Sequence, residues 1–263
     1  MSGDDELLEV AVEAARMAGA LLAERVRRGT EREVASKSTP TDLVSEADLA
    51  SEHAIRELLA DRRPGDGFVG EESGGGPGST GLEWVVDPLD GTVNFLFGIP
   101  QWCVSVAVRD AEGARAGAVY DPSRNELFTA TRSGRARVIG PAGVAELAGR
   151  ASGGLSEAMI ATGFAYDARV RAAQGRVIER LLPRTRDIRR LGSAALDLAW
   201  TAAGRYDAYF ERSVKPWDIA AGQLLCERAG LAVRELPEAE DLPWGILVAP
   251  AAIVGPLMEL VTG

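Results

Sequence analysis

Apolar residues in the first sixty positions recur at intervals of three and four, which is the spacing of one face of a helix. One such stripe predicts a helix over residues 5–27, and a second predicts a helix over residues 46–61. The Pro-Gly-Asp-Gly sequence at 64–67 ends this unit, because both residue types interrupt regular structure. The glycine-rich segment 74–79 then predicts a flexible loop.

Short apolar segments bounded by turn residues dominate the middle of the chain. Residues 84–86 predict a buried strand, and three further strands are predicted at 104–108, 116–120 and 126–130. The turns between these three strands are short, and a parallel pair needs a longer crossover, so we expect antiparallel neighbours. The Gly-Pro-Ala-Gly sequence at 140–143 predicts a break in the chain.

Strands and helices alternate after this break, which favours a mainly parallel sheet covered by helices. Strands are predicted at 157–161, 187–191, 206–211, 231–234 and 246–249, and helices at 167–182, 193–203, 217–229 and the C-terminus. The fold class is therefore α+β or α/β in two parts. We expect an N-terminal half, residues 1–141, on an antiparallel sheet and a C-terminal half, residues 142–263, on a mainly parallel sheet.

The composition is that of a globular protein. Of the 263 residues, 46% are hydrophobic and 26% are charged, which allows a core without disulfides. The formal net charge is −10, and nucleic-acid binding is not expected because it usually needs a basic face. The one local basic cluster predicts a solvated face or a dimer contact, with an anionic substrate or partner as the alternative; it comprises Arg184, Arg186, Arg189 and Arg190.

Cysteine usage and the N-terminal pattern predict a soluble, cytoplasmic protein. Cys103 and Cys226 lie far apart in apolar surroundings, which favours buried free thiols over a disulfide or a metal site. Acidic residues precede the first basic residue, Arg16, so we expect no secretory signal. The longest uncharged run, residues 244–258, is too short to span a membrane.

The only histidine, His53, lies in a helical pattern and is expected on a helix surface. A Ser-His-Asp triad, a Cys-His pair or a His-rich zinc site would have to use this residue. Catalytic acid–base chemistry and metal ligation are therefore expected from carboxylates, hydroxyls and backbone groups.

Carboxylates are concentrated in four segments that the predicted elements place at strand ends and in loops: residues 37–48, 70–73, 84–95 and 215–222. Each segment also has a structural interpretation. These are a capping box at Ser45 and Asp48, a solvated pair at Glu71 and Glu72, a turn at 87–91, and a helix cap at Trp217 and Asp218. Four such segments in one chain favour a shared functional site.

The segment that follows the predicted strand at 84–86 is the most informative of the four. Asp87 follows the strand directly, and Pro88 blocks further ladder pairing, so Asp90 can turn back toward Asp87. Converging carboxylates need a cation, and a hard ion with oxygen ligands such as Mg²⁺ fits. If a helix begins at Thr92, its N-terminus beside Gly91 forms an anion site. Metal and phosphate sites side by side indicate phosphoester chemistry.

Three of these motifs together resemble the inositol monophosphatase family, whose members are Mg²⁺-dependent, lithium-sensitive phosphomonoesterases. The motifs are Gly70-Glu71-Glu72, the segment from Trp84 to Phe95, and Trp217-Asp-Ile-Ala-Ala-Gly222. The resemblance runs from the first predicted helix to the last. It implies a layered αβαβα sandwich and a homodimer.

The resemblance also implies two to three Mg²⁺ ions and their ligands. Glu71, Asp87 and the Leu89 carbonyl would hold the first ion, and Asp87, Asp90 and Asp218 would hold the second. A third, weaker ion would lie near Glu71. Family members hydrolyse the ester by the attack of metal-activated water, with no phosphoenzyme.

Catalytic and substrate-binding roles follow from the same resemblance. Thr92, oriented by Asp48, would position the attacking water. The resemblance implies that Thr92, Asp48 and Glu71 are the catalytic residues. The amides of Gly91 and Thr92 would bind phosphate. The remaining substrate-side residues implied by the family are Gly192, Ser193, Ala194, Glu211 and Lys37, the last of which is alternatively a solvated loop lysine.

The physiological substrate is not fixed by these motifs. Inositol 1-phosphate is the favoured member of a class of small phosphorylated polyols and sugars. A histidinol-phosphate phosphatase or a broad sugar phosphatase, such as a fructose-1,6-bisphosphatase, would use the same metal site. A regulatory module that binds RNA polymerase on the same fold is the alternative from another class.

Overall fold

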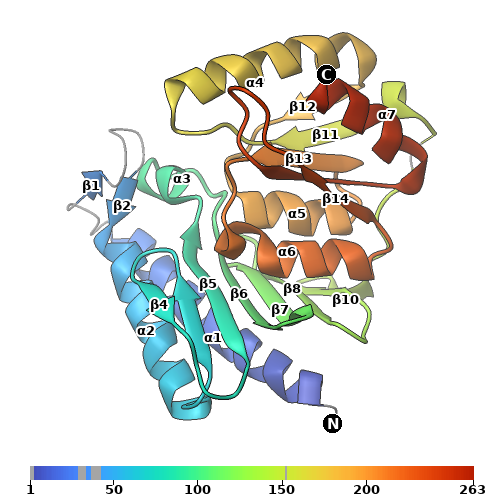
Figure 1. The fold of residues 1–263 in the computed structure, drawn as a ribbon. Coiled ribbons are helices and arrows are strands. Elements are labelled where there is room, and N and C mark those ends of the chain that lie inside the picture. The colour runs from blue at the N-terminus through green and yellow to red at the C-terminus, as the bar shows by residue number, and fades with distance from the viewer. Residues whose placement is uncertain (1–2, 29–33, 37–42, 152) are drawn as a thin grey trace.

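Layers of helices and sheets alternate through the molecule in the order helices, sheet, helices, sheet, helices (Figure 1). The computed structural model describes residues 3–28, 34–36, 43–151 and 153–263. The predicted α/β sandwich is confirmed.

The long helices lie close to their predicted ranges, and a short helix begins at Thr92. Their bounds are α1 Gly3–Arg28, α2 Glu46–Arg62, α3 Thr92–Leu96, α4 Ala168–Leu181, α5 Ala194–Ala202, α6 Pro216–Arg228 and α7 Ala251–Thr262, with short 3₁₀ turns η1 Leu155–Glu157 and η2 Leu182–Arg184. Helices α1 and α2 cover one face of the larger sheet, α5 and α6 lie between the sheets, and α4 and α7 cover the outer face of the smaller sheet. Among the described residues, no helix combines the length and apolar character needed to cross a bilayer.

The larger sheet has the strand order β10-β9-β8-β7-β6-β5-β3-β4. Its strands are β3 Gly67–Gly70, β4 Gly74–Gly76, β5 Glu83–Asp90, β6 Cys103–Asp110, β7 Gly113–Asp121, β8 Glu126–Thr131, β9 Arg137–Gly140 and β10 Gly143–Glu146. The neighbours from β5 to β10 are antiparallel, which confirms the prediction for β6, β7 and β8, whereas β3 and β5 are parallel. A separate antiparallel pair joins β1 (Val34–Ser36) to β2 (Leu43–Ser45).

The edges of this sheet differ from the expectation. The predicted loop at 74–79 begins with strand β4, whose three glycines have no side chains to form an alternating pattern. At the other edge, β9 and β10 form a hairpin around the predicted break at 140–143. The expected boundary at 141/142 falls inside this hairpin, and the sheet continues to Glu146.

The smaller sheet has the order β12-β11-β13-β15-β14 and is mixed rather than mainly parallel. Its strands are β11 Met159–Thr162, β12 Asp187–Arg189, β13 Ala208–Arg212, β14 Ala232–Leu236 and β15 Gly245–Ala249. The pairs of β11 with β12 and with β13 are parallel, and the pairs of β15 with β13 and with β14 are antiparallel. The connection from β14 to β15 contains no helix, and such a short link joins antiparallel strands.

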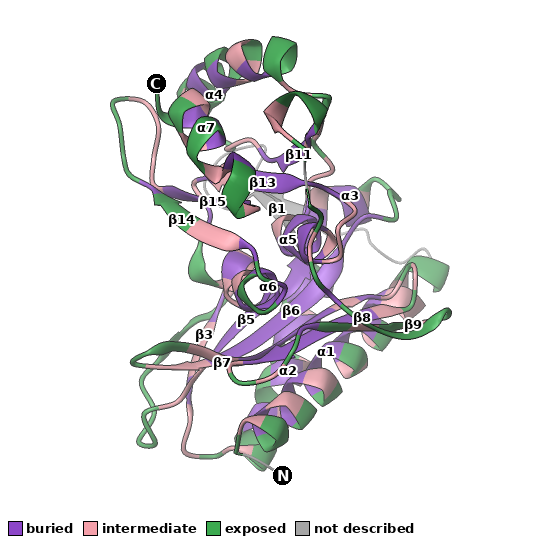
Figure 2. Ribbon diagram, turned by 90° about the vertical axis from the view of Figure 1, so that its right-hand side faces the viewer, coloured by how far each residue is buried: buried purple, intermediate pink, exposed green. Residues whose placement is uncertain are grey.

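Alternation along the strands divides the apolar residues between separate cores. Val104, Val106 and Val108 of β6 pack toward α1 and α2, whereas Cys103 and Ala107 pack toward α5 and α6. This is the period of two expected of a strand covered on both faces. Figure 2 shows the buried residues concentrated in the sheets and in the two helices between them.

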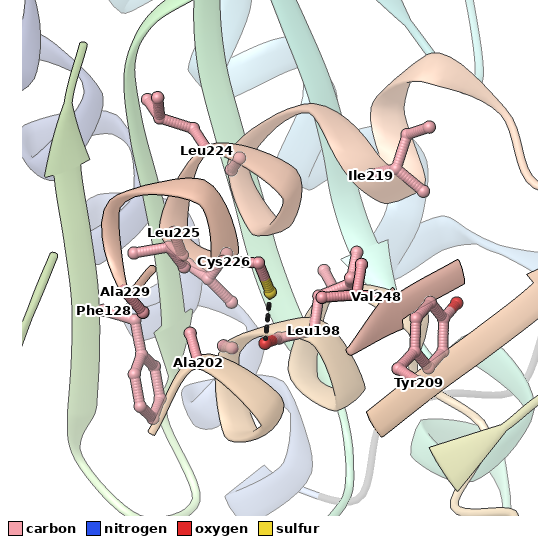
Figure 3. Packing of buried hydrophobic residues seen from close by; sticks show 14 of the residues in the cluster. Phe128, Leu198, Ala202, Tyr209, Ile219, Leu224, Leu225, Cys226, Ala229 and Val248 are labelled. Atoms are coloured by element: carbon pink, nitrogen blue, oxygen red, sulfur yellow. Dashed lines mark hydrogen bonds between the residues drawn. The ribbon is translucent and has the colours of Figure 1, made fainter. Parts of the chain in front are cut away.

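Helices α5 and α6 pack closely in the core between the sheets (Figure 3). The Cys226 thiol donates to the Leu198 carbonyl at 3.2 Å. Cys226 and Cys103 are both free and buried, as predicted. A Cβ placed on Gly222 of α6 would lie 2.5 Å from the Cβ of Leu198, so glycine is needed for this close approach.

Gly222→Ala is therefore expected to destabilise the chain by about 1–3 kcal/mol, because an added methyl group overpacks the contact with Leu198. Gly175 of α4 is the matched control, since a Cβ there meets no atom within 4 Å. Gly175→Ala is expected to stabilise by about 0.5–1 kcal/mol through helix propensity. Urea unfolding of both variants checks this opposite sign, and equal stabilisation by the two alanines would contradict it.

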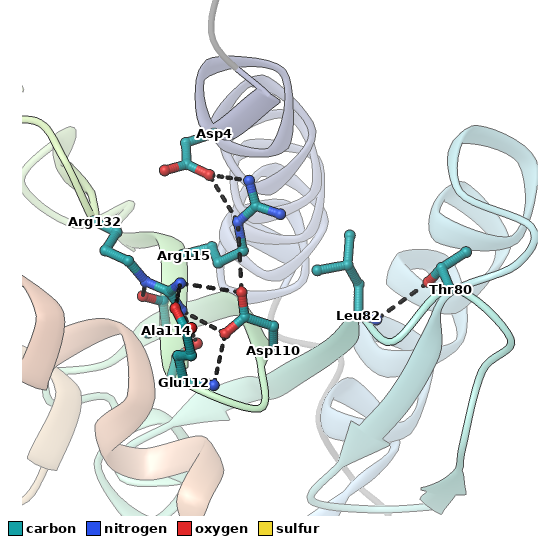
Figure 4. Close-up of polar contacts among 9 residues, drawn as sticks. Asp4, Thr80, Leu82, Asp110, Glu112, Ala114, Arg115 and Arg132 are labelled. Atoms are coloured by element: carbon teal, nitrogen blue, oxygen red, sulfur yellow. Dashed lines mark hydrogen bonds and ion pairs between the residues drawn. The ribbon is translucent and has the colours of Figure 1, made fainter.

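Ion pairs join the start of α1 to the hairpin of β6 and β7 (Figure 4). Arg115 Nε donates to Asp4 Oδ1 at 2.8 Å, and Arg132 Nη2 donates to Asp110 Oδ1 at 2.6 Å. The bond from Arg132 lowers the pKa of the Asp110 carboxyl. These contacts are partly exposed, so they orient the helix more than they stabilise it.

Candidate functional site

A cavity of about 460 Å³ lies where the end of β5 meets the N-termini of α5 and α6. The residues predicted for the site that line it are Glu71, Asp87, Leu89, Asp90, Gly91, Thr92, Gly192, Ser193, Ala194, Glu211 and Asp218. They come from segments that are distant in sequence, and the fold brings them together. Lys37 lies outside the described residues, and His53 lies exposed on α2 beside Glu57.

Strand β5 carries the central motif into the cavity through an irregular turn. Asp87 pairs with Ser105 and Asp90 pairs with Cys103, so the register shifts between the two aspartates. Pro88 lies in this shift. It was expected to end the pairing of the strand, but β5 resumes its pairing at Asp90. A bulge of this kind redirects side chains next to functional sites, and both Asp87 and Asp90 line the cavity.

Gly91 permits the sharp transition from β5 to α3. Its φ is 95°, a left-handed conformation that favours glycine, and a Cβ there would lie 2.8 Å from the Gln101 carbonyl oxygen. The predicted helix start at Thr92 is confirmed. The Thr92 hydroxyl donates to Asp48 Oδ1 at 2.8 Å, with the Leu89 carbonyl oxygen 3.1 Å away.

Asp48 both caps helix α2 and contacts a residue of the site, Thr92. Its Oδ2 accepts hydrogen bonds from the Ser45 amide at 2.8 Å and the Ser45 hydroxyl at 2.7 Å, which closes the predicted capping box of α2. Its other oxygen accepts from Thr92. Burial raises the pKa of Asp48, the bonds from Ser45 and Thr92 oppose this shift, and Glu71 adds to it.

The carboxyls of Glu71, Asp87, Asp90 and Asp218 repel one another across the cavity. Burial raises the pKa of Asp87 well above its usual value, and Glu71, Asp90 and Asp218 raise it further. Burial and then Glu71 raise the pKa of Asp218 in the same direction. Burial also raises the pKa of Asp90 to about 6, although bonds from Ser193 and Ala195 lower it. Hard oxygen donors under mutual repulsion are the donor set that Mg²⁺ prefers.

Backbone amides donate hydrogen bonds to three of these carboxylates. Asp87 Oδ1 accepts from the Leu89 amide at 3.0 Å, and Asp218 Oδ2 accepts from the Lys215 amide at 2.6 Å as part of the α6 cap. Asp90 is the third. Within the described part of the chain, no three Asp, Glu, His or Cys side chains form a ready-made metal site. The oxygen donors are of the type that Mg²⁺ prefers, but these side chains would have to adjust to bind it.

The turn at residues 192–194 holds Asp90 in place. The Ser193 hydroxyl donates to Asp90 Oδ2 at 2.6 Å, and the Ala195 amide donates to the same oxygen at 2.7 Å. Asn94 supports the turn from α3, because its amide donates to the Leu191 carbonyl at 2.7 Å. The turn thus joins the larger sheet to the N-terminus of α5, a contact that the motif alone did not predict.

Glu211 reaches the opposite wall of the cavity from β13. It accepts a hydrogen bond from the Tyr209 hydroxyl at 2.8 Å. Burial raises the pKa of Glu211 to about 7, while the Tyr209 bond and the Arg190 guanidinium act to lower it. Arg190, which the sequence assigned only to a basic cluster, also lines the cavity.

Asp197 of α5 is a buried carboxyl near the site, and it was not among the residues predicted from the sequence. Its side chain is 1% exposed, and neither oxygen makes a hydrogen bond of normal geometry within the described residues. Burial raises its pKa well above the usual value, and Glu211 and Asp90 add to this shift, whereas Arg190 and the nearby Tyr206 hydroxyl act to lower the pKa. A helical pattern predicts which face a residue occupies, but not whether its carboxyl finds a partner.

Asp197→Asn is expected to stabilise the chain by about 1–3 kcal/mol near pH 8, because it removes a carboxyl that is costly to bury, either as the ion or held protonated at that pH. The raised folded-state pKa means that the native state holds this proton longer than the unfolded chain does. The stability of the wild type therefore falls as the pH rises above the unfolded value, and asparagine removes that fall. Urea unfolding between pH 5 and 8 measures the difference, and a constant or opposite difference would contradict the assignment.

Comparisons with known proteins extend over nearly the whole chain. A family model described as "Inositol monophosphatase family" matches residues 4–256. The "Inositol-1-monophosphatase" of Mycobacterium leprae is 44% identical over 228 residues, which cover 84% of this chain and 78% of the relative. The "Nus factor SuhB" of Escherichia coli K12 is 41% identical over 226 residues, 85% of this chain and 83% of the relative. The solved structure of the Bartonella henselae extragenic suppressor protein suhB superposes with a TM-score of 0.87 at 33% identity, covering 97% of this chain and 98% of that one.

Proposed function

The chain belongs to the inositol monophosphatase family, and we propose that it is a Mg²⁺-dependent phosphatase that hydrolyses inositol 1-phosphate. One observation carries the proposal: four carboxylates from three separate segments line one cavity beside the Thr92–Asp48 pair. Phosphate-monoester hydrolysis needs charge stabilisation at the phosphoryl group and a positioned water; the carboxylates would supply the first through the Mg²⁺ they hold, and the Thr92–Asp48 pair would supply the second.

The residues that would hold Mg²⁺ are those with hard oxygen donors. In this proposal Glu71, Asp87 and the Leu89 carbonyl would hold a first ion, Asp87, Asp90 and Asp218 would hold a second, and a third would lie near Glu71. Mg²⁺, when bound, would stabilise charge on the phosphoryl oxygens and favour deprotonation of water.

Thr92 and Asp48 are proposed to position the attacking water. Because the Thr92 hydroxyl donates its proton to Asp48, its lone pairs can accept a hydrogen bond from water. As this water attacks phosphorus, its proton would pass to the Thr92 oxygen while the Thr92 proton passes to Asp48, whose raised pKa favours accepting it. The bond from phosphorus to the ester oxygen breaks, this oxygen takes a proton from solvent, and the products are inositol and phosphate.

The rest of the cavity is proposed to bind the substrate. The amides of Gly91 and Thr92 lie at the start of α3, where phosphate oxygens find donors. The Glu211 carboxylate would accept hydrogen bonds from ring hydroxyls, and residues 192–194 would support the same side. A role for Lys37 beside the metals remains a prediction from the family resemblance.

Phosphate release across a substrate panel tests this proposal. The panel holds inositol 1-phosphate, histidinol phosphate, fructose 1,6-bisphosphate, a nucleotide 3′-phosphate and NADP, each with and without lithium. We expect selective, Mg²⁺-dependent and lithium-sensitive release from inositol 1-phosphate. A preference for histidinol phosphate or the sugar bisphosphate would retain the mechanism and overturn the substrate.

A regulatory role is the second candidate, because one relative with 41% identity carries the name Nus factor. It predicts binding of the transcription machinery with no release from any member of the panel. We also propose that the chain forms a homodimer, which the family membership supports. A cytoplasmic location is proposed as well, because the two buried cysteines are free thiols. Light scattering of the purified chain tests the dimer.

A further inference from the structure

The first half of α2 presents one buried polar face to the segments that line the cavity. Asp48, Ser51 and Glu52 follow the spacing i, i+3, i+4, which places side chains on one face of a helix. They are 0%, 0% and 2% exposed. Asp48 accepts from Thr92 of α3, and the Ser51 hydroxyl donates to the Pro88 carbonyl at 2.8 Å. One helix therefore holds separate segments of the site.

Glu52 makes the third attachment, and it uses both of its carboxylate oxygens. Oε2 accepts from the Glu72 amide at 2.9 Å, and Oε1 accepts from the Ser73 amide at 2.9 Å. These amides belong to the two residues that follow Glu71. On its other side, the Glu71 amide donates to the Val86 carbonyl of β5 at 3.2 Å. The backbone around Glu71 is thus fixed from β5 and from α2.

The end of β3 is shaped around the Glu52 carboxylate. A Cβ on Gly70 would lie 2.7 Å from Glu52 Cδ, so glycine leaves the space that this carboxylate fills. Arg56, one turn further along α2, donates to the Ser73 hydroxyl, and its guanidinium lies 4.7 Å from the centre of the Phe68 ring. Glu52 itself does not line the cavity. A buried carboxylate is costly unless its hydrogen bonds are made. Glu52 accepts its hydrogen bonds from the turn that follows Glu71.

We propose that Glu52 is a positioning residue for Glu71 and that, through Glu71, it sets the affinity of the site for Mg²⁺. This inference rests on the proposed function, in which Glu71 is a metal ligand. Groups that orient the ligands of a metal typically change its affinity by about 10–100-fold when they are lost. Glu52 acts through the backbone at 72–73 rather than by a contact with substrate.

Glu52→Gln tests the proposal with little change of shape. The amide oxygen can accept one backbone N–H, but the amide nitrogen then faces the other donor. We expect the Mg²⁺ concentration for half-maximal phosphate release to rise about 10–100-fold, with kcat at saturating Mg²⁺ little changed. The rise in Tm that Mg²⁺ produces should shrink at a fixed Mg²⁺ concentration, because ligand stabilisation follows affinity. Glu57→Gln is the matched control, since Glu57 lies on the same helix with its side chain 71% exposed.

Gly70→Ala approaches the same contact from the other side, because its methyl group displaces the Glu52 carboxylate. It should reproduce the weaker response to Mg²⁺, whether or not Glu52→Gln folds well. A lower Tm with an unchanged Mg²⁺ midpoint and an unchanged Mg²⁺-induced shift in both variants would overturn the proposal. A wild type that releases no phosphate would instead count against the proposed function, and the Mg²⁺-induced Tm shift would still decide the role of Glu52.

Discussion

Asp87→Asn is expected to lower kcat by more than about 10³-fold, well beyond the loss typical of an outer partner of a metal. Asp87 faces Glu71, Asp90 and Asp218 and is proposed to bind both central ions. Asparagine keeps the side-chain shape, but it removes the negative charge and one acceptor oxygen. Steady-state phosphate release from inositol 1-phosphate at saturating Mg²⁺ measures the effect.

The fold should survive this substitution. An uncharged amide at position 87 relieves repulsion among the neighbouring carboxyls, so the Tm without Mg²⁺ should be unchanged or higher. Asp61→Asn, at an exposed position of α2, makes the same chemical change away from the site and should leave turnover intact. Near-normal turnover in Asp87→Asn would contradict the assignment of this cavity as the active site.

Thr92→Val should reduce kcat by about 10²–10⁴-fold while KM changes little, as expected for the loss of acid–base assistance. Valine has nearly the shape of threonine, but it offers no lone pair to water and no proton to Asp48. Thr92→Ser keeps the hydroxyl and should retain most of the activity. Comparison of kcat and KM for the two variants separates the hydroxyl from the methyl group.

Asp48→Asn completes the test of this pair. If Thr92 acts only when Asp48 orients it, the double variant with Thr92→Val should be little slower than either single variant. Independent, additive losses would show that the two residues do not act as a unit. Because Asp48 also caps α2, the Tm of its variants should be compared with that of Ser45→Ala, which removes part of the same cap.

The helices and the central strands could be predicted because burial repeats regularly along them. The apolar stripe of α1 and the alternation in β6 each leave a periodic signal in the sequence. Strand β4 leaves none, because its glycines carry no side chains. The hairpin of β9 and β10 was interpreted as a break, since its Gly-Pro-Ala-Gly turn resembles a linker.

The candidate site was predictable where its residues adjoin in sequence. Asp87, Asp90 and Thr92 lie within one motif, and the structure lines one cavity with them. The supporting contacts were not predictable, because they join segments far apart. The helical pattern of α2 does not indicate that Glu52 binds the turn at 72–73. The contact of Ser193 with Asp90 spans the two sheets in the same way.

Mg²⁺ titration of the metal-stripped wild type is the most direct test of the central claim. The chain is treated with EDTA and exchanged into metal-free buffer, and phosphate release from inositol 1-phosphate is followed as Mg²⁺ is added. The account predicts no release without the ion and a saturable recovery with it. Release that EDTA leaves unchanged, or no release at any Mg²⁺ concentration, would contradict it.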